Sequence, residues 1–141
     1  MGRFLALDLG TVTLGVAVSR TGIIASSYEE FRFPDHQWHI ALHEVERIVK
    51  LEQIDTIVLG LPLNVDGTDS EMTKNARKFC LKLKKNFAGI KVVFQDERWS
   101  TMDATDILLA GDLTRKKRKK CIDRIAAQVI LERYLQEKGD N

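Results

Sequence analysis

The sequence predicts an α/β fold in which one mixed β-sheet of about five strands carries helices on both faces. Three observations support this prediction. Two apolar segments near the N-terminus flank a short Gly-Thr turn, two further short apolar segments alternate with helical ones, and an amphipathic segment closes the chain. Hairpin-linked strands followed by strand–helix–strand crossovers give a sheet with both antiparallel and parallel pairs.

The first third of the chain predicts three strands and a helix. Residues 3–9 and 14–19 are apolar strands that pair around the intervening turn, and residues 23–33 form a third strand with a weaker pattern. Pro34 and Asp35 break the chain after it. Between Trp38 and Leu51 the apolar residues recur at helical spacing, at Ala41, Val45, Ile48 and Val49.

The middle of the chain predicts two more strands around a helix. Residues 56–60 are apolar throughout and end in glycine, which is typical of a buried central strand. Residues 68–71 read Thr-Asp-Ser-Glu and match a capping box that begins a helix. The buried stripe of this helix is Met72, Ala76, Phe79 and Leu83. Residues 91–95 form the last strand.

Two helices complete the predicted architecture. The first begins near residues 100–103 and ends at Gly111. The second begins with Asp123 and continues to about Lys138, with an apolar face made by Ile122, Ile125, Ala126, Val129 and Ile130. In such sheets, functional side chains gather at the carboxyl ends of strands.

Length and composition predict a single domain over residues 1–141, large enough to bury its own core. The longest apolar stretches are too short to span a membrane, and no signal-peptide pattern opens the chain. Two cysteines, Cys80 and Cys121, fit free thiols in a reducing compartment. We therefore expect a cytoplasmic protein that makes no membrane contact.

The charge of the chain is concentrated in one place. The net charge is only +2, yet six of the 22 basic residues form a single run. Without it, 16 basic residues would face 20 acidic ones. The run is Arg115, Lys116, Lys117, Arg118, Lys119 and Lys120. Such a run is typical either of a solvated surface or of a site that meets the phosphates of a nucleic acid.

Three acidic residues stand out because each adjoins apolar neighbours at the boundary of an element: Asp8, Glu97 and Asp123. Carboxylates brought together raise one another's pKa unless a cation neutralises them. Hard divalent ions with oxygen ligands, Mg²⁺ or Mn²⁺, meet that need and can drive phosphodiester hydrolysis. The spacing leaves plainer readings open: an ion pair between Glu97 and Arg98, and a helix-start acid at Asp123 favoured by the helix dipole.

Four ordered blocks resemble the YqgF family, also described as RuvX-like Holliday junction resolvases. The blocks are Asp8-Leu9-Gly10-Thr11 with Gly15-Val16-Ala17-Val18-Ser19, Gly60-Leu61-Pro62-Leu63-Asn64-Val65-Asp66-Gly67, Asp96-Glu97-Arg98-Trp99-Ser100-Thr101, and Ile122-Asp123-Arg124-Ile125-Ala126-Ala127-Gln128-Val129-Ile130-Leu131. The resemblance covers nearly the whole chain. It implies a ribonuclease H-like fold and a metal-dependent nuclease site with Asp8, Glu97 and Asp123 as its acids.

The resemblance also implies a substrate. The family is linked to trimming the 5′ end of pre-16S ribosomal RNA, and resolution of branched DNA is the older proposal. We expect Thr11, Asn64, Arg98 and the basic run at 115–120 to contact nucleic acid. The chain departs from the family where a basic pair usually precedes the Ile-Gly of the first block, since Val12 and Thr13 stand there. Arg20 or the basic run would have to replace those cations.

Other readings remain open. The Asp8–Thr11 turn also resembles the phosphate-binding turn of actin-like ATPases, but those proteins close two such domains over the nucleotide. Three histidines, His36, His39 and His43, lack further ligands for zinc nearby. Trp99 fits stacking on a base, whereas Trp38 fits packing at a helix start. A module that binds nucleic acid without cutting it, as a monomer or weak homodimer, is the main alternative to a nuclease.

Overall fold

The computed structural model describes residues 2–97 and 115–139, the latter with side chains from Ile125 to Lys138. Its elements, in chain order, are β1 (Phe4–Leu9), β2 (Thr13–Ser19), β3 (Ser26–Arg32), α1 (Trp38–Glu52), β4 (Thr56–Leu61), α2 (Glu71–Asn86), β5 (Lys91–Asp96) and α4 (Arg115–Gly139). The helix predicted between residues 100 and 111 lies outside the described residues.

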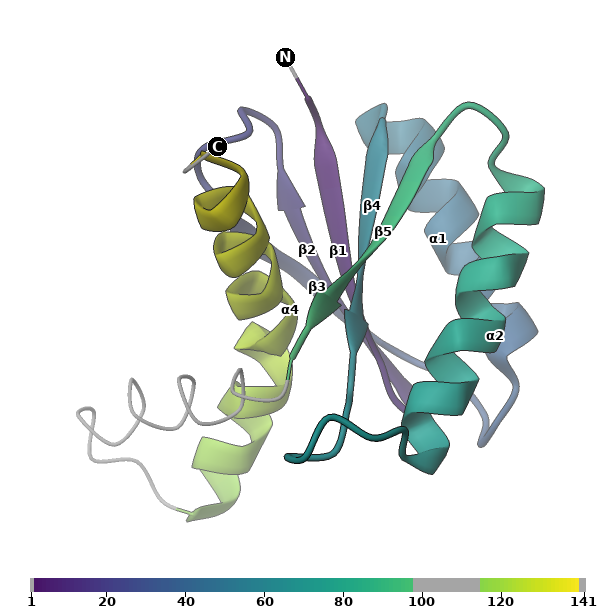
Figure 1. The fold of residues 1–141 in the computed structure, drawn as a ribbon, viewed down its shortest axis with the longest axis vertical. Coiled ribbons are helices and arrows are strands. Elements are labelled where there is room, and N and C mark those ends of the chain that lie inside the picture. Colours follow the sequence, from purple (N-terminus) through teal and green to yellow (C-terminus); the bar gives the residue numbers. More distant parts are fainter. Residues whose placement is uncertain (1, 98–114, 140–141) are drawn as a thin grey trace.

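One five-stranded sheet in the order β3-β2-β1-β4-β5 forms the centre of the molecule. Antiparallel pairs join β3 to β2 and β2 to β1, and parallel pairs join β1 to β4 and β4 to β5. The helices α1 and α2 cover one face and α4 covers the other (Figure 1). The predicted mixed sheet of five strands with helices on both faces is therefore confirmed.

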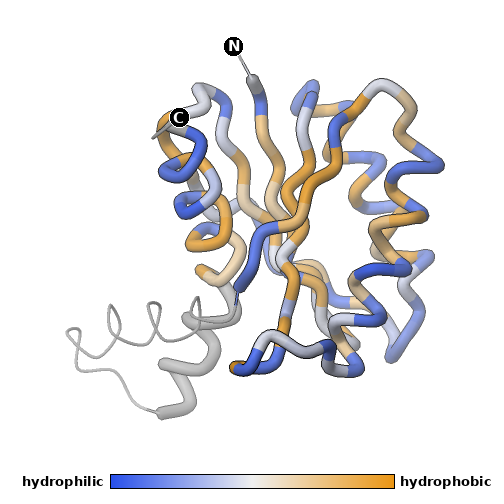
Figure 2. The backbone as a smooth tube through the Cα atoms, in the orientation of Figure 1, coloured by the Kyte–Doolittle hydropathy of each residue, from blue (hydrophilic) through white to orange (hydrophobic). Residues whose placement is uncertain are grey.

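The alternation of side chains along the strands builds two cores. On the face of α1 and α2, a large aliphatic and aromatic cluster includes Leu5, Leu7, Leu59 and Phe79. On the face of α4, a smaller cluster contains Phe4 and four alanines. Small side chains let a helix approach a sheet closely, so α4 packs tightly on this side. The central strands are largely hydrophobic, whereas hydrophobic and hydrophilic residues alternate along the helices (Figure 2).

The third strand is shorter than the sequence predicts, because it begins at Ser26 and not at residue 23. The hydroxyl oxygen of Thr21 accepts hydrogen bonds from the backbone amides of Ile23 and Ile24, which holds these residues in a turn. Their side chains are exposed, by 82% and 67%. The β-branched side chains of Ile23 and Ile24 favour a strand, but the turn at Thr21 prevents these residues from joining β3.

The start of α2 also corrects a prediction. The capping box uses Ser70 and Thr73, so the helix begins at Glu71 and not after Thr68. Thr68 is already engaged in the preceding loop, where its hydroxyl donates to Asp66 and accepts from Asn64. A residue whose hydroxyl and backbone close a turn is not available to cap a helix.

The last helix differs most from its prediction. It begins at Arg115, so the basic run at 115–120 forms its first turns and Asp123 lies well inside it. Lysine and arginine are good helix formers, and the run contains neither proline nor glycine to stop the helix. The reading of Asp123 as a helix-start acid is therefore wrong. None of the helices within the described part of the chain is long and apolar enough to cross a membrane.

Candidate functional site

Asp8 lies near the carboxyl end of β1 and faces α4. Alternate residues of β1 point to opposite faces: Leu5 and Leu7 belong to the core under α1 and α2, and Phe4 and Ala6 belong to the core under α4. By the same alternation, Asp8 points to the same face as Phe4 and Ala6, the face under α4. It is half-buried, in a strand whose other residues are fully buried. The only acid in β1 is therefore placed on the face that α4 covers.

Glu97 follows the end of β5, and a glycine makes the space for its carboxyl group. The backbone amide of Glu97 donates to the carbonyl of Leu61 at 3.2 Å. A Cβ atom added to Gly60 would collide with the Oε2 atom of Glu97 and would lie 2.7 Å from the Cδ1 atom of Ile130 on α4. The carboxyl group of Glu97 therefore lies directly over Gly60, against α4.

The sheet register explains why this position brings Glu97 to Asp8. Leu7 of β1 pairs with Leu59 of β4, so Asp8 and Gly60 are the next residues on two adjacent strands. The missing side chain at Gly60 leaves room beside Asp8, and the carboxyl group of Glu97 occupies it. Two acids that are 89 residues apart in the chain, the difference between positions 97 and 8, are thus brought into contact.

The electrostatics of this pair are unusual. Burial of the Glu97 carboxyl group, then the charge of Asp8 and a hydrogen bond to it, and finally the charge of Asp96, raise the pKa of Glu97 from 4.5 to about 9. Two carboxyl groups can hydrogen-bond only when one of them carries a proton. At neutral pH, Glu97 is therefore the protonated partner and donates to Asp8.

This donor set fits a hard divalent cation. Carboxylate oxygens are the ligands that Mg²⁺ and Mn²⁺ prefer, and a cation would relieve the repulsion that the shared proton now relieves. Among the residues whose side chains are described, no group of three or more metal-binding side chains gathers. The side chain of Asp123, the third predicted acid, lies outside the described residues. The two described acids alone form an incomplete ligand set.

The backbone of α4 brings residue 123 to the same side of the sheet. Ala127 and Ile130 are completely buried against this face. Residues three, four and seven positions apart share one face of a helix. Position 123 lies four residues before Ala127 and seven before Ile130, so it lies on the face of α4 that packs against the sheet.

The turn that follows Asp8 is fixed by the segment before α1. Its three successive carbonyl groups all accept hydrogen bonds, from the Nε1 atom of Trp38 to Gly10 (3.0 Å), from the amide of His36 to Thr11 (2.9 Å) and from the amide of Phe33 to Val12 (2.9 Å). His36 has a φ of 60°, in the left-handed region. Hydrogen bonds therefore fix all three carbonyl groups of this turn. This contact agrees with the prediction that Trp38 packs at a helix start.

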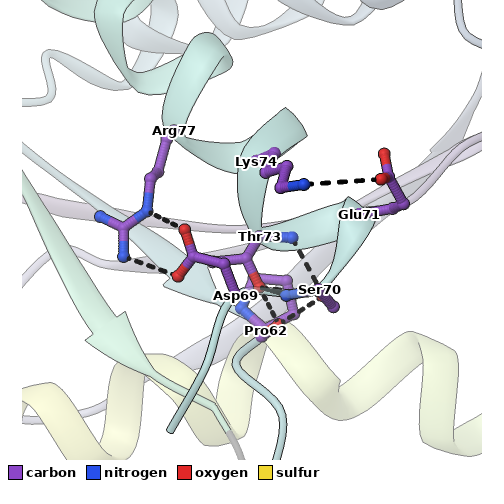
Figure 3. Close-up of polar contacts among 7 residues, drawn as sticks. All are labelled: Pro62, Asp69, Ser70, Glu71, Thr73, Lys74 and Arg77. Carbon is purple, nitrogen blue, oxygen red and sulfur yellow. Dashed lines mark hydrogen bonds and ion pairs between the residues drawn. The ribbon is translucent and has the colours of Figure 1, made fainter.

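The loop between β4 and α2 holds the predicted contact residue Asn64. Its side-chain amide donates to the Thr68 hydroxyl at 3.0 Å, so this group is used within the loop. The loop ends where the hydroxyl groups of Ser70 and Thr73 both donate to the carbonyl of Pro62, at 3.0 and 2.5 Å (Figure 3). These bonds fix the first turn of α2 against the end of β4.

The remaining predicted contacts are Arg98, the basic run at 115–120 and the possible substitute Arg20. Arg98 lies outside the described residues, as do the side chains of the basic run at 115–120 on α4. Arg20, the candidate substitute for the missing basic pair, follows the far end of β2, roughly 20 Å along the strand from the turn. It forms an ion pair with Glu52 at 2.8 Å. Arg20 therefore does not replace those cations.

Sequence reasoning missed two features of the site. It treated Gly60 only as the end of a buried strand, although a glycine inside an apolar strand is a known signal of close approach by another group. It also missed a second basic surface, on α2, whose sequence contains six basic residues and one acidic residue. The helical spacing of the lysines in the sequence was the available signal.

The model of one protein family, described as "RuvX: Holliday junction resolvase", matches residues 2–137. Among individual relatives, the "Putative pre-16S rRNA nuclease" of Geobacillus thermodenitrificans is 43% identical over 137 residues, which is 96% of this chain and 99% of the relative. The protein with the same description in Carboxydothermus hydrogenoformans is 38% identical and covers 99% of both chains.

Solved structures show the same fold at low sequence identity. RuvC of T. thermophilus, in complex with a Holliday junction substrate, has a TM-score of 0.59 and 10% identity, and covers 99% of this chain and 96% of RuvC. The yeast mitochondrial Holliday junction resolvase Ydc2 has a TM-score of 0.52, also with 10% identity, and covers 99% and 81%. These neighbours confirm the predicted ribonuclease H-like fold. The family match over residues 2–137 and the relatives at about 40% identity confirm the resemblance: the chain belongs to the RuvX family, also known as YqgF.

Proposed function

We propose that this protein is a divalent-metal-dependent nuclease that processes the 5′ end of pre-16S ribosomal RNA. The observation that carries the proposal is the Asp8–Glu97 pair, in which Gly60 leaves space for one carboxyl group to press against another. A partly buried pair of this kind costs stability, and carboxyl groups with strongly shifted pKa values cluster at functional sites. The relatives at about 40% identity, with their printed descriptions, support the choice of substrate.

In this proposal, Asp8, Glu97 and Asp123 hold the metal and are the catalytic acids. Mg²⁺ or Mn²⁺ bound there would supply an activated water and stabilise the leaving oxygen of the phosphodiester. The chain's own contribution is to position the oxygen ligands: the fixed turn at residues 10–12 holds Asp8, the strand end holds Glu97, and the α4 backbone holds position 123. Glu97 must lose its proton before it can act as a ligand.

The same proposal assigns the nucleic-acid contacts. Arg98 and the basic run at 115–120 precede or flank two of the three acids in sequence, and would hold phosphates beside the site. Thr11 and Asn64 would contact the nucleic acid from the two loops that follow β1 and β4. We place the protein in the cytoplasm, as a monomer or weak homodimer, in contact with nucleic acid and not with a membrane.

Cleavage of branched DNA is the second candidate. The description of the matching family and the fold shared with RuvC favour it. A third candidate, a module that binds without cutting, draws on the absence of the basic pair at Val12 and Thr13. The two acids in contact favour cleavage over binding alone.

One assay separates these candidates. The purified protein is given Mg²⁺ or Mn²⁺ and offered a precursor 16S ribosomal RNA and a four-way DNA junction in parallel, with Asp8→Asn as the control. Cleavage of the RNA precursor alone, absent in the control, is the expected result. Cleavage of the junction alone would favour the resolvase. Binding of either substrate without any product would support the non-catalytic module and contradict the proposed nuclease.

A further inference from the structure

A groove runs between the start of α1 and the middle of α2, on the sheet face opposite the acid pair. It has a volume of about 320 Å³, and its walls are mainly apolar. Its lining residues are Trp38, Asn75, Lys78, Phe79, Leu81 and Lys82. Leu81 is 68% exposed, so its side chain is available at the surface of α2. An aromatic ring, an apolar floor and two ammonium groups therefore border one hollow.

The helix that forms one wall is strongly basic. Six basic residues of α2 are exposed and only Glu71 opposes them within the helix. Two of the six are neutralised, since Arg77 pairs with Asp69 at 3.1 Å and Lys74 with Glu71 at 3.7 Å (Figure 3). Within the described residues, Lys78 and Lys82 have no ion-pair partner. The groove therefore presents two uncompensated positive charges.

The groove is connected to the proposed active site through one side chain. Trp38 lines the groove, and its Nε1 atom donates to the carbonyl of Gly10 at 3.0 Å. Gly10 lies two residues after Asp8, in the turn that closes the end of β1. Trp38 therefore marks the point where the groove reaches the end of the sheet that carries the acids.

We propose that this α1–α2 groove binds a single-stranded segment of the nucleic-acid substrate that flanks the bond to be cut. Lys78 and Lys82 contact successive phosphates, and a base lies against Trp38 and Leu81. The identity of the occupant rests on the proposed nuclease function. Grooves that combine cations along the backbone with an aromatic surface for bases are how proteins hold single strands without reading their sequence.

Charge and shape favour this occupant over an acidic protein helix. A helix that docks in a groove needs an apolar strip several turns long, whereas this groove offers one aromatic ring and one exposed leucine between lysines. A nucleic-acid strand needs regularly spaced cations and a single flat apolar surface. Lys78 and Lys82 are one helical turn apart, with about 6 Å between their Cβ atoms. This distance is close to the spacing of adjacent phosphates along an extended nucleic-acid strand.

The first test compares two double variants with equal changes of charge on the same helix. Lys78→Gln with Lys82→Gln alters the groove, and Lys84→Gln with Lys85→Gln alters exposed lysines that do not line it. Binding of a twelve-nucleotide single strand is measured in EDTA, so cleavage plays no part. We expect the groove variant to weaken binding roughly tenfold and to lower the salt slope by about 1.4, for two phosphate contacts. The control variant should keep most of the affinity.

The second test observes Trp38 directly. In a Trp99→Phe protein, Trp38 is the only tryptophan, and binding of the strand should quench its fluorescence. A strand of the same length without bases should bind through its phosphates but leave the emission largely unchanged. Stacking on an aromatic ring requires a base, so this contrast isolates the base contact.

Three results would overturn the proposal: equal losses of affinity in the two double variants, no change in Trp38 emission when the strand binds, or quenching by an acidic apolar peptide but not by the strand. A short substrate that reaches only the acids tests the nuclease function separately, because its cleavage does not depend on Lys78 and Lys82. If the protein does not cleave this substrate, the proposed nuclease function fails, whatever the groove binds. With long substrates, the groove variant should raise KM and leave kcat unchanged.

Discussion

Two pairs of carboxyl groups among the described residues, Glu29 with Glu44 and Asp8 with Glu97, are neutralised in different ways. Glu29 on β3 lies beside Glu44 on α1. Burial first, and then the hydrogen bond and charge of Glu44, raise the pKa of Glu29 to about 7. Arg47 forms two hydrogen bonds of 2.8 Å with Glu44 and holds its pKa below the ordinary value. This pair therefore has its own cation, supplied by α1.

In the Asp8–Glu97 pair, no arginine or lysine among the described residues lowers the pKa of Glu97. Burial, Asp8 and Asp96 all raise its pKa, to about 9, and no described cation lowers it. Under the proposed function, this difference separates a structural acid pair from one that holds a metal. Where the protein supplies an arginine, the cost of the pair is offset within the fold. Where only a proton joins the two acids, the pair is suited to a cation from solution.

The largest effect expected from this comparison is on catalysis. Asp8→Asn should lower kcat by at least about 10³-fold, because it removes a charged ligand from the site. Metal-free stability at pH 8 should fall only slightly, since the side-chain carbonyl of Asn can still accept the hydrogen bond from the protonated Glu97. Single-turnover cleavage and thermal unfolding measure the two quantities.

The matched control is Glu29→Gln, which changes one acid in the other pair. It should leave the cleavage rate within about twofold of the unsubstituted protein, because Arg47 and Glu44 are not part of the site. A comparable loss of activity in the two variants would mean that the pairs do not differ in function.

A smaller loss is expected from Gly60→Ala. A methyl group there would overlap the Glu97 carboxyl group and press on Ile130. Displacing a ligand by about 1 Å commonly costs about 10²-fold in rate. Asp8 and Glu97 remain chemically intact, so the kinetic defect would be purely positional. Full activity in this variant, with a folded protein, would show that the position of Glu97 over Gly60 is irrelevant to cleavage.

Metal binding should stabilise the protein and depend on pH. At a Mg²⁺ concentration a hundred times Kd, the free energy of unfolding should rise by about 2.7 kcal/mol. Because Glu97 is protonated below pH 9 and must ionise to bind the metal, affinity should increase about tenfold per pH unit from pH 6 towards 9. Calorimetric titration at several pH values measures this slope, and Glu97→Gln should abolish it.

The smallest effect concerns stability at the Glu29–Glu44 pair. The folded-state pKa of Glu29 is near 7, above its ordinary value of 4.5. The contribution of Glu29 to the free energy of unfolding is therefore fully present below pH 4.5 and is lost as the pH rises through 7. Glu29→Gln mimics the protonated form, so it should flatten this dependence. It should also stabilise the protein by about 1 kcal/mol at pH 8, after discounting for partial exposure. Denaturant unfolding at pH 5 and pH 8 measures the difference, and an unchanged pH dependence would contradict the assignment.

Much of the fold was predictable because its signals are local. Continuous apolar runs such as residues 56–60 identified buried strands, and the helical spacing from Ala41 to Val49 identified α1. Boundaries failed where polar side chains formed competing local bonds, as Thr21 does before β3 and Thr68 does before α2. The start of α4 was missed because a run of lysines and arginines was read only as charge and not as helix-forming sequence.

The site was predictable in composition but not in geometry. Asp8 and Glu97 were chosen from their apolar neighbours and from the family resemblance. Their contact depends on two features that no local pattern shows: the register of β1 against β4, and the empty space over Gly60. The basic face of α2 is harder to recognise than the contiguous run Arg115–Lys120, because other residues, several of them buried, interrupt the basic residues of α2.

The central claim is that Glu97 shares a proton with Asp8 until a metal ion displaces it. Carbon-13 NMR of glutamate side-chain carboxyl groups, assigned with Glu97→Gln, follows this proton directly. We expect Glu97 to titrate near pH 9 in the metal-free protein and to remain ionised throughout that range in saturating Mg²⁺. A metal-free Glu97 that titrates near 4.5, its ordinary value, would contradict the account.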